Sequence, residues 1–216
     1  MAKANSSFSE VQIARRIKEG RGQGHGKDYI PWLTVQEVPS SGRSHRIYSH
    51  KTGRVHHLLS DLELAVFLSL EWESSVLDIR EQFPLLPSDT RQIAIDSGIK
   101  HPVIRGVDHG GPSDIKKESK DGPFEQFAIQ VKPAAALKDE RTLEKLELER
   151  RYWQQKQIPW FIFTDKEIDS VVKENIEWLY SAKTEIVSAE LLAQLPTLAS
   201  ILQDNGDKNI ITVCKQ

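Results

Sequence analysis

The chain has 216 residues, of which 38% are apolar and 28% are charged, so it has enough apolar residues to form a core. No apolar run approaches the roughly 20 residues that span a bilayer, and the N-terminal residues lack the apolar stretch of a secretory signal. Cys214 is the one cysteine, which excludes an internal disulfide and fits a reducing, cytoplasmic location.

Charge is unevenly distributed along the chain. The net charge is −2, but residues 1–57 carry ten Lys and Arg against four Asp and Glu, so the remainder is acidic. A basic flank suits a surface that neutralises DNA phosphates, although an ordinary solvated surface has the same composition. We expect phosphate contacts from five basic residues near the N-terminus: Arg15, Arg16, Lys18, Arg21 and Lys27.

The first half of the chain is predicted to mix helices and strands. A strong helix begins at Ser60, where Ser60 and Glu63 have the spacing of a capping box. The helix carries apolar residues at helical spacing. The other predicted elements of this half are a helix, a hairpin, a strand and a short helix, over residues 9–19, 46–56, 76–83 and 88–97.

Two strands and a long helix are predicted in the next part of the chain. Residues 124–132 alternate as a strand, which places Gln130 and Lys132 on the same face. Residues 138–156 form a long charged helix, and residues 159–164 are a continuous apolar run typical of a central strand.

This order of elements predicts an α/β fold with a mixed sheet flanked by helices. The sheet domain, together with the basic N-terminal segment, is expected to cover residues 1–164. Residues 165–216 are expected to form a separate, mostly helical domain. Its predicted helices cover residues 168–180 and 188–195, with a weaker helix from Leu198.

Four polar residues, distant in the sequence, could together hydrolyse a phosphodiester. Glu63 lies in the first turn of a helix, Asp114 shortly before a strand, and Gln130 and Lys132 on one face of a strand. Mg²⁺ prefers oxygen ligands and keeps several waters, so two or three protein oxygens suffice to hold it. A lysine beside the ion can polarise the attacking water or bind the phosphate.

Each of these residues also has a purely structural interpretation. Glu63 is explained as the acid of the capping box, and Asp114 as a turn residue that bonds its own backbone. Gln130 and Lys132 would equally suit the solvent face of an edge strand. The histidines lack the tight spacing of zinc ligands, which disfavours a zinc site.

A helix Glu, then an Asp, then Gln-x-Lys on a strand is similar to the pattern of restriction-endonuclease-like nucleases. Longer segments resemble the TnsA family, the endonuclease subunits of heteromeric bacterial cut-and-paste transposases, along nearly the whole chain. These segments are Tyr29-Ile-Pro-Trp-Leu33, Lys51-Thr-Gly-Arg-Val-His-His-Leu-Leu-Ser-Asp-Leu-Glu63, Asp78-Ile-Arg-Glu-Gln-Phe-Pro84 and Gln126-Phe-Ala-Ile-Gln-Val-Lys-Pro133.

The resemblance implies a restriction-endonuclease-like catalytic domain that cuts DNA at the 5′ ends of a transposon. It implies that Glu63, Asp114 and Gln130 bind the metal, with the backbone carbonyl of Val131 as a further ligand. Lys132 matches the catalytic lysine of the family. The expected cofactor is Mg²⁺ or Mn²⁺, with two ions bound.

The resemblance also implies partners and a bacterial, cytoplasmic location. A TnsB-type DDE transposase would cut and join the 3′ ends, and each protein would depend on the other. A TnsC-type ATPase regulator would contact the C-terminal domain. That domain is winged-helix-like in the family and longer than residues 165–216, so this segment is expected to be part of a winged helix.

One segment departs from the family pattern. Residues 115–120 have almost no strand character, whereas the metal-binding Asp of the family leads into an apolar strand. Either neighbouring strands hold this segment, or Asp114 is displaced and Asp108 or Asp121 replaces it. Two other functions therefore stay open: a non-catalytic module that binds DNA ends and recruits partners, and a restriction enzyme that acts alone.

Overall fold

The chain divides into two compact units, Met1–Lys166 and Glu167–Gln216, and each is described here by itself. The computed structural model describes residues 10–38, 43–104, 107–108, 112–119, 126–180 and 189–205. Only the backbone is described for residues 103–104, 107–108 and 112–119, and for Glu190, Leu191 and Leu198. In this part of the chain, no helix is both long enough and apolar enough to cross a membrane.

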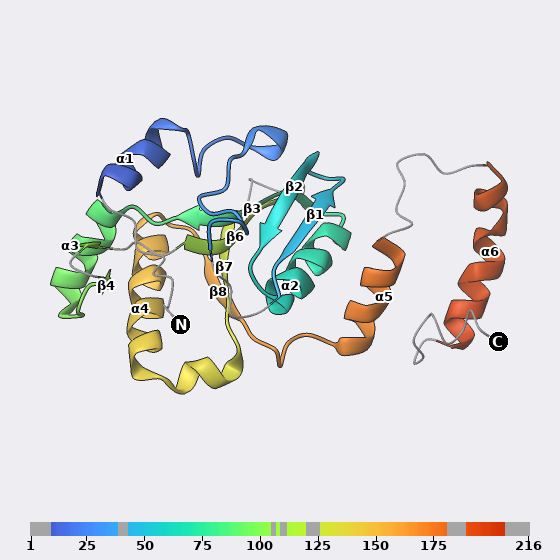
Figure 1. Cartoon of the computed structure of the whole chain (residues 1–216). Helices are drawn as coiled ribbons and strands as arrows, with labels where there is room; N and C mark the ends of the chain where they lie inside the picture. Colours follow the sequence, from blue (N-terminus) through green and yellow to red (C-terminus); the bar gives the residue numbers. More distant parts are fainter. Residues whose placement is uncertain are drawn as a thin grey trace. The chain divides into compact units, whose positions relative to one another are not determined.

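The first unit is built around a four-stranded mixed sheet with the order β3-β6-β7-β8 (Figure 1). Both β3 and β7 pair with β6 antiparallel, and β8 pairs with β7 parallel. A parallel pair needs a crossover connection, which helix α4 (Glu140–Gln155) provides. The strands are β3 (Val76–Pro84), β6 (Pro112–Ser119), β7 (Phe127–Val131) and β8 (Trp160–Phe163). This mixed sheet with its helices confirms the predicted α/β fold.

Strand β6 lies inside the sheet although its sequence is very polar. Its backbone pairs with β3 along nearly its whole length and with β7 from Ile115 to Lys117. Hydrogen bonds to neighbours on both sides therefore hold a segment that has little strand propensity of its own. Of the two alternatives for residues 115–120, the structure supports a strand held by its neighbours, at least as far as Ser119.

Helix α2 (Asp61–Trp72) packs against β3, β7 and a hairpin formed by β1 (His45–Ser49) and β2 (Arg54–Leu58). Residues 63–68 of the helix are all buried, so it is covered on most sides. The hairpin turn is fixed by the buried Glu71, which accepts hydrogen bonds from the backbone N–H groups of His50 and Lys51. The predicted hairpin and the predicted helix start at Ser60 are both confirmed.

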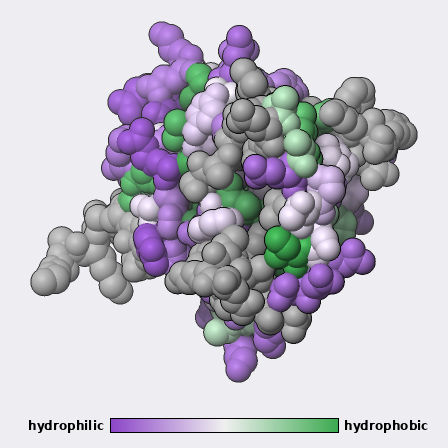
Figure 2. All heavy atoms as spheres, turned by 90° about the vertical axis from the view of Figure 1, so that its right-hand side faces the viewer, coloured by the Kyte–Doolittle hydropathy of each residue, from purple (hydrophilic) through white to green (hydrophobic). Residues whose placement is uncertain are grey.

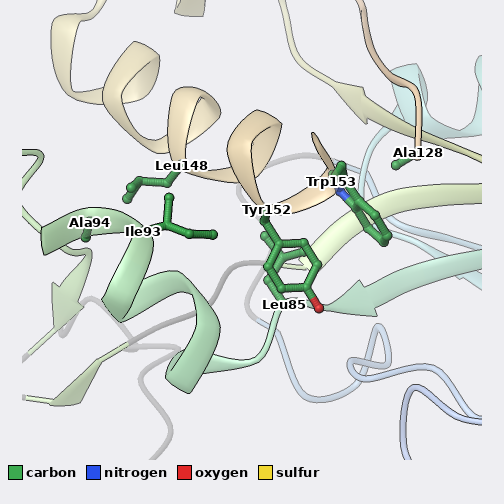
Figure 3. Close-up of a cluster of buried hydrophobic side chains, with 7 residues drawn as sticks. All are labelled: Leu85, Ile93, Ala94, Ala128, Leu148, Tyr152 and Trp153. Carbon is green, nitrogen blue, oxygen red and sulfur yellow. The ribbon is translucent and has the colours of Figure 1, made fainter. Parts of the chain in front are cut away.

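A hydrophobic cluster joins α3 (Pro87–Ser97) and α4 to the sheet (Figure 3). Trp153 is almost completely buried, and the centroid of its ring lies 5.2 Å from the ring centroid of Tyr152. Because α4 carries these aromatic groups on the face turned to β7 and α3, the crossover helix is anchored to the strand that bears Gln130. The buried members are Leu85, Ile93, Ala94, Ala128, Leu148, Tyr152 and Trp153.

The remaining elements of the first unit are short. Helix α1 precedes a glycine-rich loop in which Gly24 has a φ of 88° and an added Cβ would lie 2.4 Å from the Asp28 carbonyl oxygen. Only glycine suits that position without movement of the loop. These elements are α1 (Glu10–Lys18), η1 (Gly26–Asp28), β4 (Val103–Ile104), β5 (Val107–Asp108) and η2 (Ala134–Lys138).

The described part of the second unit consists of two helices, α5 (Ser170–Tyr180) and α6 (Ala189–Asp204). The sequence predicted two helices on either side of Pro196, but α6 continues through this proline. Proline removes one backbone hydrogen bond, and the apolar residues on both sides keep helical spacing. The assignment of this unit to part of a winged helix stays a prediction, and residues 206–216 lie outside the described residues.

Candidate functional site

Glu63 is held at the start of α2 by three hydrogen-bond donors. Its carboxylate accepts from the Leu59 backbone N–H at 2.9 Å and from the Ser60 hydroxyl at 3.3 Å. The Ser60 hydroxyl in turn accepts from the Glu63 backbone N–H at 3.1 Å, which is the predicted capping arrangement. The third donor is the side-chain amide of Gln82, at 3.1 Å. Glu63 can therefore cap the helix and also belong to a functional site, because its carboxylate contacts Gln82 on the sheet as well as its own helix start.

Strand β7 positions the three consecutive residues that the sequence singled out. Gln130 and Val131 are buried, and Lys132 is half-buried just after the strand. The parallel pairing places Gln130 beside Ile162, and the Lys132 backbone N–H donates to the Phe163 carbonyl at 3.0 Å. Gln130 therefore does not lie on the solvent face of an edge strand, since β6 and β8 flank β7 and the side chain is buried.

Asp114 lies on β6, and its backbone position is well defined by the register. Glu81 pairs with Ile115 and Phe83 pairs with Ser113, so Asp114 stands opposite Gln82 on β3. On the other side the β6–β7 pairing ends with Ile115 opposite Ile129, so Asp114 and Gln130 each lie one residue beyond that last pair. The side chain of Asp114 lies outside the described residues, as do the side chain of Asp108 and the whole of Asp121.

These positions offer oxygen atoms of the kind that bind hard divalent cations. The candidate donors are the Glu63 carboxylate, the Gln130 side-chain oxygen and the Val131 carbonyl, a set that suits Mg²⁺ or Mn²⁺ better than zinc. Among the side chains that the structure describes, no three His, Cys, Asp or Glu residues gather as a metal-binding cluster. The proposed ligands are a different set, because the Asp114 side chain lies outside the described residues and Gln130 is a glutamine.

Gln82 is a residue of this region that the sequence did not single out. It is 1% exposed, its amide donates to Glu63, and its amide oxygen has no hydrogen-bond partner within the described structure. Its φ of 52° is left-handed, which is uncommon for a residue other than glycine. Strained residues with unpaired buried polar atoms gather at functional sites. The sequence signal was weak: a polar run, Arg80-Glu-Gln82, in a strand that is otherwise buried.

A buried ionic cluster fixes β3 directly beside Gln82. Arg54 on β2 donates to both oxygens of Glu81, at 2.8 and 2.6 Å, and also to the Ile79 carbonyl at 2.8 Å. The His56 Nδ1 lies 2.6 Å from the Glu81 carboxylate. Burial acts to raise the pKa of Glu81, but the charge of His56 and the Arg54 hydrogen bond outweigh it and hold the pKa at about 2. The cluster thus joins the hairpin to the strand that carries Gln82.

The predicted phosphate-binding residues fall into two groups. Arg16 is buried, and its guanidinium donates to the Trp32 carbonyl and to Glu37. Arg21 donates to the same carboxylate at 2.8 Å and to Glu19 at 2.9 Å. Partial burial acts to raise the pKa of Glu37, but the hydrogen bond from Arg21 helps to hold it at about 2. These two arginines tie α1 to the loop after it.

The second group is exposed. Arg15 and Lys18 lie on the outer side of α1, and Lys27 lies in the short helix η1. Arg15 forms an exposed i,i+4 ion pair with Glu19 at 3.3 Å, which contributes little to stability and can be exchanged for another anion. The structure therefore leaves Arg15, Lys18 and Lys27 available at the surface, whereas the guanidinium groups of the buried Arg16 and the partly buried Arg21 are bonded to Glu37.

Comparison with known proteins places this geometry in a family context. Residues 73–165, from just before β3 to just after β8, match the family model described as TnsA-like endonuclease N terminal. The whole chain is 90% identical over 216 residues to the transposon Tn7 transposition protein TnsA of Escherichia coli. The aligned region covers 100% of this chain and 79% of that protein. The matched model includes the positions of Asp114, Gln130 and Lys132, and the longer alignment adds Glu63.

Proposed function

Because the chain belongs to the TnsA family of transposition proteins, we propose that it is a metal-dependent DNA endonuclease of a cut-and-paste transposon. The reaction is hydrolysis of a DNA phosphodiester at the 5′ ends of the element during excision. The proposal is supported most directly by one observation: the buried Gln82 donates to Glu63 at 3.1 Å, and the β3–β6 register sets Gln82 opposite Asp114. These adjacent positions support a site that contains Glu63 and Asp114.

The ligand set that we propose consists of oxygen atoms from α2, β6 and β7. Glu63 and Asp114 provide carboxylates, Gln130 provides an amide oxygen, and Val131 provides its backbone carbonyl. We propose Mg²⁺ or Mn²⁺ as the cofactor, with two ions per site. When bound, a divalent ion neutralises phosphate charge and makes a water more acidic. The protein contributes a fixed geometry: Glu63 is restrained by three donors, and Gln130 is buried within the sheet.

Lys132 is proposed to act on the scissile phosphate or on the attacking water. Lys132 follows Gln130 by two residues, so the side chains of Gln130 and Lys132 are expected on the same face of the sheet. The backbone of Lys132 is held by the Phe163 carbonyl, which fixes where the side chain starts. An ammonium group there acts as a compact positive charge that stabilises the negative charge developing in the transition state.

DNA contacts outside the site are assigned to the exposed basic residues of the N-terminal segment. Arg15, Lys18 and Lys27 are proposed to contact phosphates, which positions the duplex without reading its sequence. Arg16 and Arg21 support this surface by holding α1 in place, and their guanidinium groups already bond to Glu37.

We propose two protein partners, since the relative with which the chain is aligned is a transposition protein. A TnsB-type DDE transposase would process the 3′ ends, so that both strands are cut only when both proteins are present. A TnsC-type ATPase would bind the second unit, Glu167–Gln216. That unit exposes apolar side chains, including Trp178 and Leu192. On the face of the whole chain drawn in Figure 2, hydrophobic residues occur as separate patches among hydrophilic ones.

The test is strand-specific cleavage of a plasmid that carries transposon ends, with the TnsB-type partner present. Asp114→Asn and Lys132→Ala should each lower 5′-strand cleavage by about 100-fold or more while the fold is retained. Lys138→Ala, an exposed lysine of η2, is the matched control and should cleave at the wild-type rate. Near-normal cleavage by either site variant would defeat the proposal.

The same experiment separates the two alternative functions. A non-catalytic module that binds DNA ends would show no cleavage by the wild-type chain and no heat of Mg²⁺ or Mn²⁺ binding in calorimetry. A restriction enzyme that acts alone would cut the plasmid at defined sequences without any partner. Cleavage that requires the partner and is lost in Asp114→Asn excludes both.

A further inference from the structure

We propose that Gln82 is a positioning residue of the metal site, an inference that rests on the proposed function. Its side-chain NH₂ group fixes the Glu63 carboxylate, and its amide oxygen accepts a hydrogen bond from a water that accompanies the divalent ion. Gln82 lies on β3, a strand that contributes none of the four residues named from the sequence pattern.

The orientation of the Gln82 amide follows from its neighbour. The nitrogen lies 3.1 Å from a Glu63 carboxylate oxygen, to which it donates. A flipped amide would set two oxygen atoms against each other, one of them on a carboxylate, so the nitrogen must face Glu63. The amide oxygen of Gln82 is therefore directed away from that carboxylate.

That oxygen is the unexplained atom of the site. It is buried and has no hydrogen-bond partner among the residues that the structure describes. Buried carbonyl oxygens in native proteins are almost always paired, with protein or with ordered water. A hydrated divalent ion brings waters whose hydrogens need acceptors, because Mg²⁺ keeps several of its waters when it binds to protein.

The position of Gln82 in the sheet brings this oxygen to the right region. The β3–β6 register sets Gln82 opposite Asp114, and Gln130 follows Ile129, the last residue of β7 that pairs with β6. Helix α2 packs on both β3 and β7, and Glu63 in its first turn accepts the Gln82 hydrogen bond. Gln82 is thus bonded to one proposed ligand and adjacent in register to a second.

The backbone around Gln82 is held in a conformation that glutamine rarely adopts. Its φ is 52°, and its carbonyl accepts from the Trp32 backbone N–H at 3.3 Å. The preceding residue, Glu81, is anchored by Arg54. Contacts on both sides therefore maintain a strained backbone at one residue, which is the pattern expected where geometry matters for binding.

The test is a calorimetric titration of the full chain with Mn²⁺, using variants of similar size. Gln82→Met removes both the donor and the acceptor and should weaken Mn²⁺ binding by about tenfold, the usual effect of losing a partner of a metal ligand. Gln92→Met, at an exposed glutamine whose side chain donates to Asp96, is the matched control and should bind as the wild type does.

Gln82→Glu separates a role at the ion from a purely structural one. It keeps an acceptor oxygen but sets a second carboxylate against Glu63, so the metal-free variant should melt at a lower temperature than the wild type. Its Mn²⁺ affinity should nevertheless equal or exceed that of the wild type, because the ion neutralises both groups. A purely structural residue would leave Mn²⁺ affinity the same in Gln82→Met and Gln82→Glu, so weaker binding in the first with retained binding in the second identifies a role at the ion.

Three outcomes can be told apart. Weaker Mn²⁺ binding in Gln82→Met with retained binding in Gln82→Glu supports the proposal. Unchanged binding in Gln82→Met, together with loss of binding in Asp114→Asn, overturns the role of Gln82 and leaves the nuclease proposal intact. Absence of Mn²⁺ binding by the wild-type chain overturns both.

Discussion

Substitution of Arg54 by methionine should destabilise the protein by about 3–5 kcal/mol, the cost of leaving a buried charge without its partner. The side chains of Arg54 and Glu81 are 8% and 0% exposed, so water cannot replace the lost contacts. Methionine also removes the hydrogen bond to the Ile79 carbonyl at 2.8 Å and the stacking of the guanidinium on Tyr29 at 4.9 Å. The loss should appear in urea unfolding followed by tryptophan fluorescence.

The pH dependence provides a second measure of the same interaction. The pKa of Glu81 is lowered from its usual 4.5 to about 2 in the folded protein. Because the folded-state pKa is the lower one, this stabilisation is complete above the unfolded-state value and is lost as the pH falls toward 2. At about 1.4 kcal/mol per pKa unit, the shift corresponds to about 3 kcal/mol. Arg54 contributes to this shift together with His56, so the difference between wild type and Arg54→Met should shrink as the pH falls from about 4.5 toward 2.

Two further variants make this prediction specific. Arg46→Met, at an exposed arginine of the same hairpin, should change the free energy of unfolding by less than about 0.5 kcal/mol. The double variant Arg54→Met/Glu81→Gln should recover part of the loss, because the buried carboxylate that lost its arginine is then uncharged. A loss below about 1 kcal/mol in Arg54→Met, or one that does not vary with pH, would refute the reasoning.

Three predictions concern the start of α2 and the N-terminal basic segment. Ser60→Ala removes the helix cap and one donor to Glu63, so the free energy of unfolding should fall by about 1 kcal/mol in urea titration, and an unchanged value would contradict the capping geometry. Arg15→Ala/Lys18→Ala should reduce the salt dependence of DNA binding by about one unit of slope per lost phosphate contact, measured by fluorescence anisotropy. Arg16→Met should instead lower stability by about 3 kcal/mol, and a stable variant with weaker DNA binding would reverse the assignment of these residues.

Local signals in the sequence were sufficient for much of the fold. The capping box at Ser60, the alternation before Lys132 and the apolar run that became β8 each depend on neighbouring residues, and each element forms where it was predicted. Proline at position 196 was interpreted as a helix break, yet α6 continues through it. Strand β6 was equally ambiguous, because its stability comes from pairing with two strands that are distant in sequence.

Contacts between residues that are distant in sequence were also missed at the candidate site. Glu63, Gln130 and Lys132 could be named from residue types and spacing, but the partner of Glu63 could not. Gln82 contacts Glu63 because the fold packs β3 against α2, and this contact is not local in the sequence. The left-handed backbone of Gln82 cannot be recognised from the residue types around it. Charge counting likewise treated Arg15 and Arg16 alike, whereas burial separates two adjacent arginines into a surface residue and an internal one.

The backbone of Trp32 connects helix α1 with the proposed metal site. Its carbonyl accepts from Arg16 of α1, and its N–H donates to the carbonyl of Gln82, whose side chain bonds Glu63. The helix that carries Arg15 is thus preorganised relative to the carboxylate before any duplex arrives. The conformational entropy of that helix is lost during folding and not on DNA binding. Phosphate contacts made by the helix can therefore contribute more to affinity than contacts from a segment that becomes ordered only on binding.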